Sequence, residues 1–454
     1  MKPDPNNPDW AWAPFQPDAA RPWDLRLAAH LYRRAAFGGT WPELQRALAE
    51  GPQATVDKLV QPTPEAATFN RLYDDYETAA ATAEGFGSQA WWLRRMMESP
   101  QPLHEQVTLF WHNYFGVSRV HVRDNASLCR HTQGLRQHGL SSFEELLNAV
   151  LTEPAVWTCL GAGVEGRRSL SDSAVRIVME QYSLGPGRCS DSDVREGVRA
   201  LSGWIVSQGE LRFVPTEHDA APKRILGQEG EFDRKGLVRV LAKHPATGQW
   251  LAQKLVRWFI SDTASPSESL LAPLARQLTS GGSTAQGVEM LLRSNLFFSV
   301  EAYRQKIRSP VELALGIIRP LEGKVGTVRL ATDLAKLGQE LYEPPTTRGW
   351  AGGLSWINPL TLLGRARLAE DLLAESGAYE GKLDPGALAQ RRNHQTKDGN
   401  PQFLADLYLQ GNLAPRSIEA LTPGPSPAGS GNARPADLRQ LAACLASLPE
   451  FQLA

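Results

Sequence analysis

Apolar residues recur every three to four positions along most of the chain, which is the period of an amphipathic helix. Residues 190–204 and 284–294 show this period clearly. In residues 40–51, Thr40 and Glu43 match a capping box and Gly51 follows the last periodic position. The same pattern predicts roughly fifteen to eighteen helices of ordinary length.

Two further capping boxes are expected. Ser141 and Glu144 open the predicted helix in residues 141–151, and Ser309 and Glu312 open a helix that Pro320 should end. These short-range signals fix where helices begin more firmly than periodicity alone.

One region reads as strand. Residues 204–215 place β-branched and aromatic residues around Gly209, which predicts a hairpin between helices, and residues 216–233 are expected to be loop. No repeat with a period of 20–50 residues is visible, which argues against a regular solenoid. We therefore expect an all-α fold, an irregular multi-helix bundle or array with one small β-hairpin insertion.

The chain of 454 residues is long enough for two or three domains. We expect a polar, proline-rich N-terminal arm at 1–24 and a main helical domain at 25–420, with the hairpin and loop insertion near 204–232. Residues 421–435 are rich in Pro, Gly and Ser and are expected to be a flexible linker before a C-terminal helix at 436–454.

Composition excludes several classes of function. The net charge of −1 and the scattered arginine pairs give no reason to expect a nucleic-acid partner. No apolar stretch approaches the length of a membrane span, and the four cysteines lack metal-site spacing. The N-terminus as written lacks the apolar core of a signal peptide, which predicts a cytoplasmic protein. Export remains an alternative if the start codon is misassigned.

The run LFWHNYFG, residues 109–116, places His112 and Asn113 among aromatic residues. On a helix, His112 falls opposite the main apolar stripe and close in angle to Glu105. This favours a solvated face or a hydrogen bond to a neighbouring helix. The alternative is that both side chains face a cleft, where His112 would act as an acid or base. Their separation of about 10.5 Å along the axis makes a shared metal ion a poor fit.

Asp172, Arg176 and Glu180 follow an i, i+4, i+8 spacing on a predicted helix. Such a row is usually an exposed charge stripe that stabilises the helix. The alternative is a carboxylate–arginine–carboxylate row that orients a ligand in a cleft.

His218, Asp219 and Lys223 lie in the predicted loop after the hairpin, where functional residues are common. Asp219 would fix the tautomer of His218, and Lys223 would bind an anion or act as a base. The alternative is that all three are solvated loop residues.

Trp250, Lys254 and Trp258 also follow an i, i+4, i+8 spacing, which would place Lys254 over an indole face. His244, before a proline, is typical of the start of this helix. Trp350 lies in a loop rich in proline and glycine, which indicates either exposed rings or a tightly packed turn. The chain contains no P-loop, G-x-S-x-G or H-E-x-x-H motif.

From about residue 25 to the end, the chain resembles the bacterial family called domain of unknown function 1800. The matching motifs, in order, are HLYRRAAFG, LFWHNYF, DVREGVRALSGW, EHDAAPKRILG, KHPATGQWLAQKL, RSPVEL, GQELYEPPTTRGWAGGLSWI and LPEFQLA. The resemblance implies a largely helical fold, members that are often exported and genes that often neighbour a sulfatase-like family. It implies no established reaction and no known cofactor.

The chain departs from the family pattern at polar positions. Tyr114 stands where the family usually has a second histidine, and Ala221 stands where it has glycine. In the block at 171–180, Arg176 and Glu180 remain but two asparagines and a glutamate are missing. The resemblance therefore indicates a divergent member whose polar cleft is partly eroded.

Two hypotheses follow. The first is a helical scaffold or binding protein, with a sulfatase-like protein as its expected partner. The second is a hydrolase or oxidoreductase, metal-assisted or not, with His112, His218, Asp219 and Lys223 as catalytic residues; whether the protein is an enzyme is left open. The candidate ligand-binding residues are Glu105, Asn113, Asp172, Arg176, Glu180, His244, Lys254 and Trp350.

Overall fold

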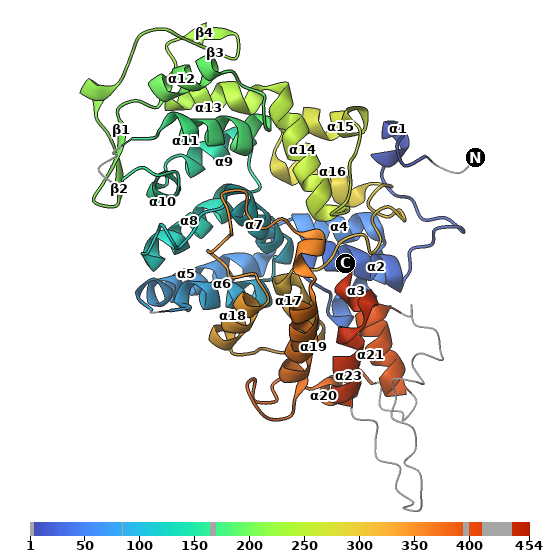
Figure 1. Ribbon diagram of the computed structural model, residues 1–454. Helices are drawn as coiled ribbons and strands as arrows, with labels where there is room; N and C mark the ends of the chain where they lie inside the picture. Colours follow the sequence, from blue (N-terminus) through green and yellow to red (C-terminus); the bar gives the residue numbers. More distant parts are fainter. Residues whose placement is uncertain (1–3, 84, 164–168, 394–398, 411–437) are drawn as a thin grey trace, which may run out of the picture.

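The computed structural model describes residues 4–83, 85–163, 169–393, 399–410 and 438–454. Helices supply nearly all of the regular structure in these residues, and the strands form two small two-stranded sheets (Figure 1). The predicted all-α fold with a small hairpin insertion is confirmed.

The helices of the first half, blue to green in Figure 1, are short and closely spaced along the chain. They are α1 (Pro8–Ala11), α2 (Leu25–Ala36), α3 (Trp41–Glu50), α4 (Pro52–Val60), α5 (Pro64–Thr82), α6 (Gly87–Glu98), α7 (Pro102–Phe115), α8 (Asn125–His138), α9 (Phe143–Val150), α10 (Pro154–Cys159), α11 (Asp172–Arg176), the π-helix η1 (Ile177–Leu184) and α12 (Asp191–Ala200).

The second half holds the remaining helices, light green to red in Figure 1. They are η2 (Pro215–Glu217), α13 (Arg234–Lys243), α14 (Pro245–Phe259), α15 (Glu268–Thr279), α16 (Thr284–Arg293), α17 (Pro310–Ile318), η3 (Arg319–Leu321), α18 (Thr327–Lys336), η4 (Gly353–Trp356), α19 (Pro359–Leu373), α20 (Pro385–Arg391), α21 (Gly399–Leu409), α23 (Leu438–Ser447) and α24 (Pro449–Gln452).

Two hairpins interrupt the helices, where one was predicted. The predicted hairpin consists of β1 (Trp204–Ser207) and β2 (Glu210–Phe213), paired antiparallel. A second one, β3 (Lys223–Ile225) and β4 (Gln228–Gly230), lies in the segment that was predicted to be loop. Its turn is Leu226-Gly227, with φ of 47° and 80°. Leucine rarely occupies a left-handed turn position. Because this turn is Leu-Gly, the sequence lacks the Asn-Gly or Asp-Gly pair that usually marks a hairpin.

Local capping explains where most helices begin. The capping boxes of Thr40 with Glu43 and of Ser309 with Glu312 are present as predicted. The third prediction was wrong by one residue, because Ser142 rather than Ser141 caps α9 and accepts a hydrogen bond from the backbone NH of Glu145. Ser141 lies in the preceding turn, where its carbonyl accepts a bond from the backbone of Thr284.

Helix α7 lies at the centre of the molecule. Twelve of its fourteen residues are buried, and α2, α4, α6 and α8 pack around it. A helix buried on all sides has no wet face, so its polar residues need partners inside the protein. The polar residues of the LFWHNYFG run must therefore find hydrogen-bond partners inside the protein.

The first and last described segments of the chain pack against the rest of the molecule. Near the N-terminus, the indole of Trp12 donates a hydrogen bond to the carbonyl of Leu270 over 2.6 Å. At the C-terminus, α23 packs on α19 and α21, and Leu448 separates it from α24, which Pro449 begins. The predicted C-terminal helix is thus two helices; the predicted linker at 421–435 lies outside the described residues.

Candidate functional site

A cavity of about 730 Å³ opens beside the C-terminal end of α7. Its walls come from α7, the α11–η1 segment, α14, the segment 306–312 and the long loop at 339–356. Residues more than 200 positions apart in the sequence meet here. The size is that of a site for a small organic molecule.

The π-helix η1 forms one wall and is tied firmly to α7. The hydroxyl of Tyr114 donates to the carbonyl of Tyr182 over 3.1 Å, and the hydroxyl of Tyr182 donates to the carbonyl of Phe115 over 2.9 Å. The wider π-helical turn shows in the bond from the backbone NH of Gly185 to the carbonyl of Glu180, five residues earlier. Such turns often occur at functional sites because they re-aim side chains.

The loop at 339–356 is held against α7 by backbone contacts. The backbone NH of Trp350 donates to Oδ1 of Asn113 over 2.7 Å. Gly349, with φ of 74°, passes so close that a Cβ there would lie 2.0 Å from the carbonyl oxygen of Asn113. Gly116 is equally restricted, since its Cβ would lie 2.6 Å from the carbonyl oxygen of Thr347. Only glycine fits at these two crossing points.

Aromatic rings line much of the cavity, and two lysines lie on their faces. Nζ of Lys254 is 4.2 Å from the ring centroid of Trp250, as the sequence spacing predicted. Nζ of Lys306 is 4.4 Å from the ring centroid of Trp258. The other rings of the lining are Phe110, Tyr114, Trp350 and Trp356.

Charged groups of both signs reach the cavity, and some are already paired. Arg176 binds Glu180 over 3.3 Å, and Lys306 binds the buried carboxylate of Glu312. Asp262 accepts a hydrogen bond from the backbone NH of Ile307 over 2.8 Å, and burial raises its pKa above the ordinary value.

Three cations of the lining have no acidic partner within the described part of the chain: Lys254, Arg257 and Arg348. Burial, together with the positive charges of Arg257 and Arg348, lowers the pKa of Lys254 to about 8. This corner of the cavity therefore carries excess positive charge next to apolar rings.

The structure brings five of the sequence-predicted residues to this cavity: Asn113, Arg176, Glu180, Lys254 and Trp350. No site role was predicted for the other charged residues of the lining, which are Arg257, Asp262, Lys306, Glu312 and Arg348. The proline- and glycine-rich loop was the available signal for Arg348. No local pattern pointed to Lys306.

His112 does not lie on a solvated face. It is fully buried behind the lining, among the rings of Trp92, Tyr342 and Trp350. Its Nε2 accepts a hydrogen bond from the backbone NH of Tyr342 over 3.2 Å, and Nδ1 has no partner among the described residues. Burial lowers the pKa of His112 to about 3, so the imidazole is neutral at pH 7.

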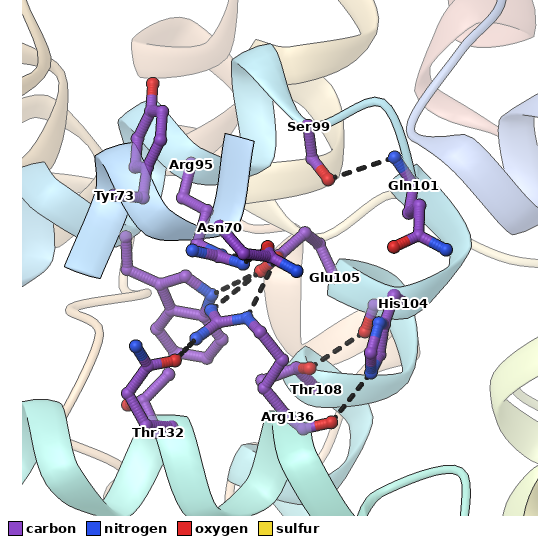
Figure 2. Close-up of polar contacts among 12 residues, drawn as sticks. Asn70, Tyr73, Arg95, Ser99, Gln101, His104, Glu105, Thr108, Thr132 and Arg136 are labelled. Atoms are coloured by element: carbon purple, nitrogen blue, oxygen red, sulfur yellow. Dashed lines mark hydrogen bonds and ion pairs between the residues drawn. The ribbon is translucent and has the colours of Figure 1, made fainter. Parts of the chain in front are cut away.

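Glu105 is likewise buried rather than facing a cleft. Figure 2 shows Arg95 and Arg136 directed at its carboxylate. Its carboxylate accepts hydrogen bonds from Nε of Arg95 over 2.8 Å and from Nε and Nη2 of Arg136, each over 2.9 Å. The indole of Trp92 adds a fourth bond over 3.1 Å. Glu105 and His112 do share one side of α7, as their angular spacing predicted, since both contact Trp92 of α6. Glu105 is covered by α8 as well, through Arg136.

His218, Asp219 and Lys223 lie together but away from the main cavity. Asp219 makes a two-point ion pair with Arg199, with Nε to Oδ2 at 2.7 Å and Nη2 to Oδ1 at 3.1 Å. Lys223 donates to the carbonyls of Asp219 and Ala221, and Nδ1 of His218 contacts the carbonyl oxygen of Ser202 at 2.9 Å. These bonds shape the segment between β2 and β3. Arg199 and Lys223 also border a second, more open hollow of about 590 Å³.

The last two candidates lie elsewhere. Asp172 is exposed at the start of α11 and is not part of either lining. His244 is the N-cap of α14, where its Nδ1 accepts a hydrogen bond from the backbone NH of Ala246 over 3.2 Å. The prediction that His244 starts a helix is confirmed.

Within the described ranges, no three or more His, Cys, Asp or Glu side chains are grouped so as to hold a metal ion. None of the helices in that same part of the chain is long and apolar enough to cross a membrane.

Comparison with known proteins gives a family but no activity. A model of the family described as "Protein of unknown function (DUF1800)" matches residues 30–453, almost the whole chain. The comparisons with curated proteins and with solved structures gave no match. The extent of the family match confirms the resemblance seen in the ordered motifs. The chain is therefore a member of the DUF1800 family.

Proposed function

We propose that this protein is a binding protein for a small anionic molecule that carries a flat apolar ring. One observation carries the proposal: Lys254, Arg257 and Arg348 gather in one part of an aromatic-lined cavity without acidic partners among the described residues. Cations held together in this way repel one another, and an anion relieves that repulsion on binding.

The residues that line the cavity suit both the anionic group and the apolar ring of such a ligand. Guanidinium and ammonium groups bind carboxylates and phosphates through charge-assisted hydrogen bonds. The rings of Trp250, Trp258 and Trp356 line the cavity and give a planar apolar group a surface to pack against. The volume of about 730 Å³ is ample for one ring system and its charged substituent.

Four naphthalene derivatives test this proposal with the ring held constant. Binding of 1-naphthoate, 1-naphthyl phosphate, 1-naphthamide and 1-naphthylmethylammonium is measured by isothermal titration calorimetry. We expect saturable binding of the two anions, weaker binding of the neutral amide and no binding of the cation. Equal affinity for all four would contradict the proposed charge selectivity.

A matched pair of variants locates the site. Lys254→Met removes the central cation and keeps the length of the side chain, and Lys235→Met removes an exposed lysine of α13. A charged hydrogen bond contributes about 1.5–3 kcal/mol, so Lys254→Met should weaken 1-naphthoate binding roughly 10- to 100-fold. The Lys235→Met protein should bind like the unmodified protein, and an equal loss in both variants would refute the assignment.

The alternative of a hydrolase or oxidoreductase stays a prediction. So do the sulfatase-like partner, the lack of a nucleic-acid partner and the cytoplasmic location.

A further inference from the structure

Three lysines with shielded side chains differ in how their ammonium groups are satisfied. Lys223 donates two hydrogen bonds to backbone carbonyls, and Lys306 forms an ion pair with Glu312. Lys254 has no hydrogen-bond acceptor among the described residues and contacts the face of Trp250 instead. Its side chain is half-buried and borders the cavity. The ammonium group of Lys254 is therefore accessible from the cavity on one side and shielded by the indole of Trp250 on the other.

The surroundings of Lys254 favour the neutral amine. The charged groups acting on it are Arg257, one turn further along α14, and Arg348 from the loop, and both are positive. Together with burial they lower its pKa from 10.5 to about 8. At pH 7 the fraction of free amine is then roughly 300 times that of an ordinary lysine. A desolvated lysine beside other cations is the usual setting of an amine nucleophile.

We infer that Lys254 is a nucleophile that forms an imine with an aromatic 2-oxo acid bound in the cavity. The inference rests on the proposed anion binding and names its substrate class. Arg257 and Arg348 would hold the carboxylate, which places the adjacent ketone carbon within reach of the cationic corner where Nζ lies. The rings of the lining would take the aromatic part of the acid.

Imine formation at Lys254 balances in atoms and in electrons. The lone pair of Nζ attacks the ketone carbon and forms a carbon–nitrogen bond, while the carbonyl π electrons move to oxygen. The resulting carbinolamine loses that oxygen as water, together with the two protons of the amine. The product is a carbon–nitrogen double bond between Lys254 and the acid, and water hydrolyses it back to the starting compounds. No oxidant or reductant is consumed.

Borohydride trapping tests this step on the full-length protein. Phenylpyruvate is added with sodium borohydride, which reduces an imine to a stable secondary amine, and peptide mass spectrometry locates the adduct. We expect labelling at Lys254 at least tenfold above that at the exposed Lys235. Labelling spread evenly over surface lysines would overturn the inference. Circular dichroism and thermal unfolding confirm that each variant used is folded.

Two controls separate this inference from the proposed binding. Lys254→Arg keeps a positive charge and removes the nucleophile, so it should abolish trapping, and the matched Lys235→Arg variant should leave trapping unchanged. Phenyllactate has a hydroxyl in place of the ketone and reports binding alone. Binding of phenyllactate without any trapping of phenylpyruvate would overturn the imine and leave the proposed function standing. Failure of both would overturn both.

Discussion

Replacing Glu105 with glutamine tests whether the buried charge cluster that Glu105 forms with Arg95 and Arg136 holds the fold together. The carboxylate of Glu105 has an exposed fraction of 1% and balances two buried guanidiniums, those of Arg95 and Arg136. Burial would raise its pKa, but the charges of Arg136 and Arg95 outweigh this and hold it at about 2. Glu105→Gln keeps the shape of the side chain and leaves both arginines without a counter-charge.

The expected loss in the free energy of unfolding of the Glu105→Gln protein can be worked out in two ways. At about 1.4 kcal/mol for each pKa unit, the drop from 4.5 to about 2 corresponds to about 3 kcal/mol at neutral pH. Removing one partner of a buried ion pair typically costs about 3–5 kcal/mol, which agrees. With an unfolding entropy of about 2.1 cal/mol/K per residue, a chain of this length should lose about 3–5 °C in Tm.

The pH dependence gives the sharper assay. Because the pKa of Glu105 is lowered in the folded state, its contribution to stability is complete above about pH 4.5 and is lost as the pH falls toward 2. Differential scanning calorimetry should therefore show a Tm difference between the two proteins at pH 7 that shrinks by pH 3. The control is Glu210→Gln, which breaks an exposed pair with Arg212 and should change Tm little. An unchanged Tm for Glu105→Gln at pH 7 would refute the reasoning.

Two further outcomes are expected. Binding of 1-naphthoate, followed by calorimetry from pH 7 to 9, should weaken as the pH rises through about 8, since Lys254 then loses its charge while Arg257 and Arg348 keep theirs. A pH-independent affinity would argue against a role for Lys254. Gly349→Ala should displace the loop from Asn113, because the new Cβ has no room, and should reduce 1-naphthoate affinity at least tenfold; unchanged affinity would count against the loop as a wall.

The sequence predicted local features well because their causes are local. Capping boxes depend on residues three apart, and the boxes at Thr40 and Ser309 are present. The cation–π contact of Lys254 with Trp250 also needs only one helical turn. The hairpin at 223–230 was missed because its turn uses Leu226, which carries no turn signal.

Contacts between residues far apart in the sequence could not be predicted. The angular spacing in α7 correctly placed Glu105 and His112 on one side of the helix, but it gave no information on what covers that side. The partner of His112 is the backbone of Tyr342, 230 residues later. The cavity also depends on long-range contacts, because Arg348 and Lys254 approach each other only after the loop at 339–356 has folded onto α7. No local pattern encodes these contacts.

The most direct test of the anion-binding cavity is a crystal structure of the protein with 1-naphthyl phosphate. The account predicts electron density for the phosphorus atom between Lys254 and Arg348, with the naphthalene ring against the aromatic wall that includes Trp250. Density for the phosphate only in the second hollow, beside Arg199 and Lys223, would contradict it.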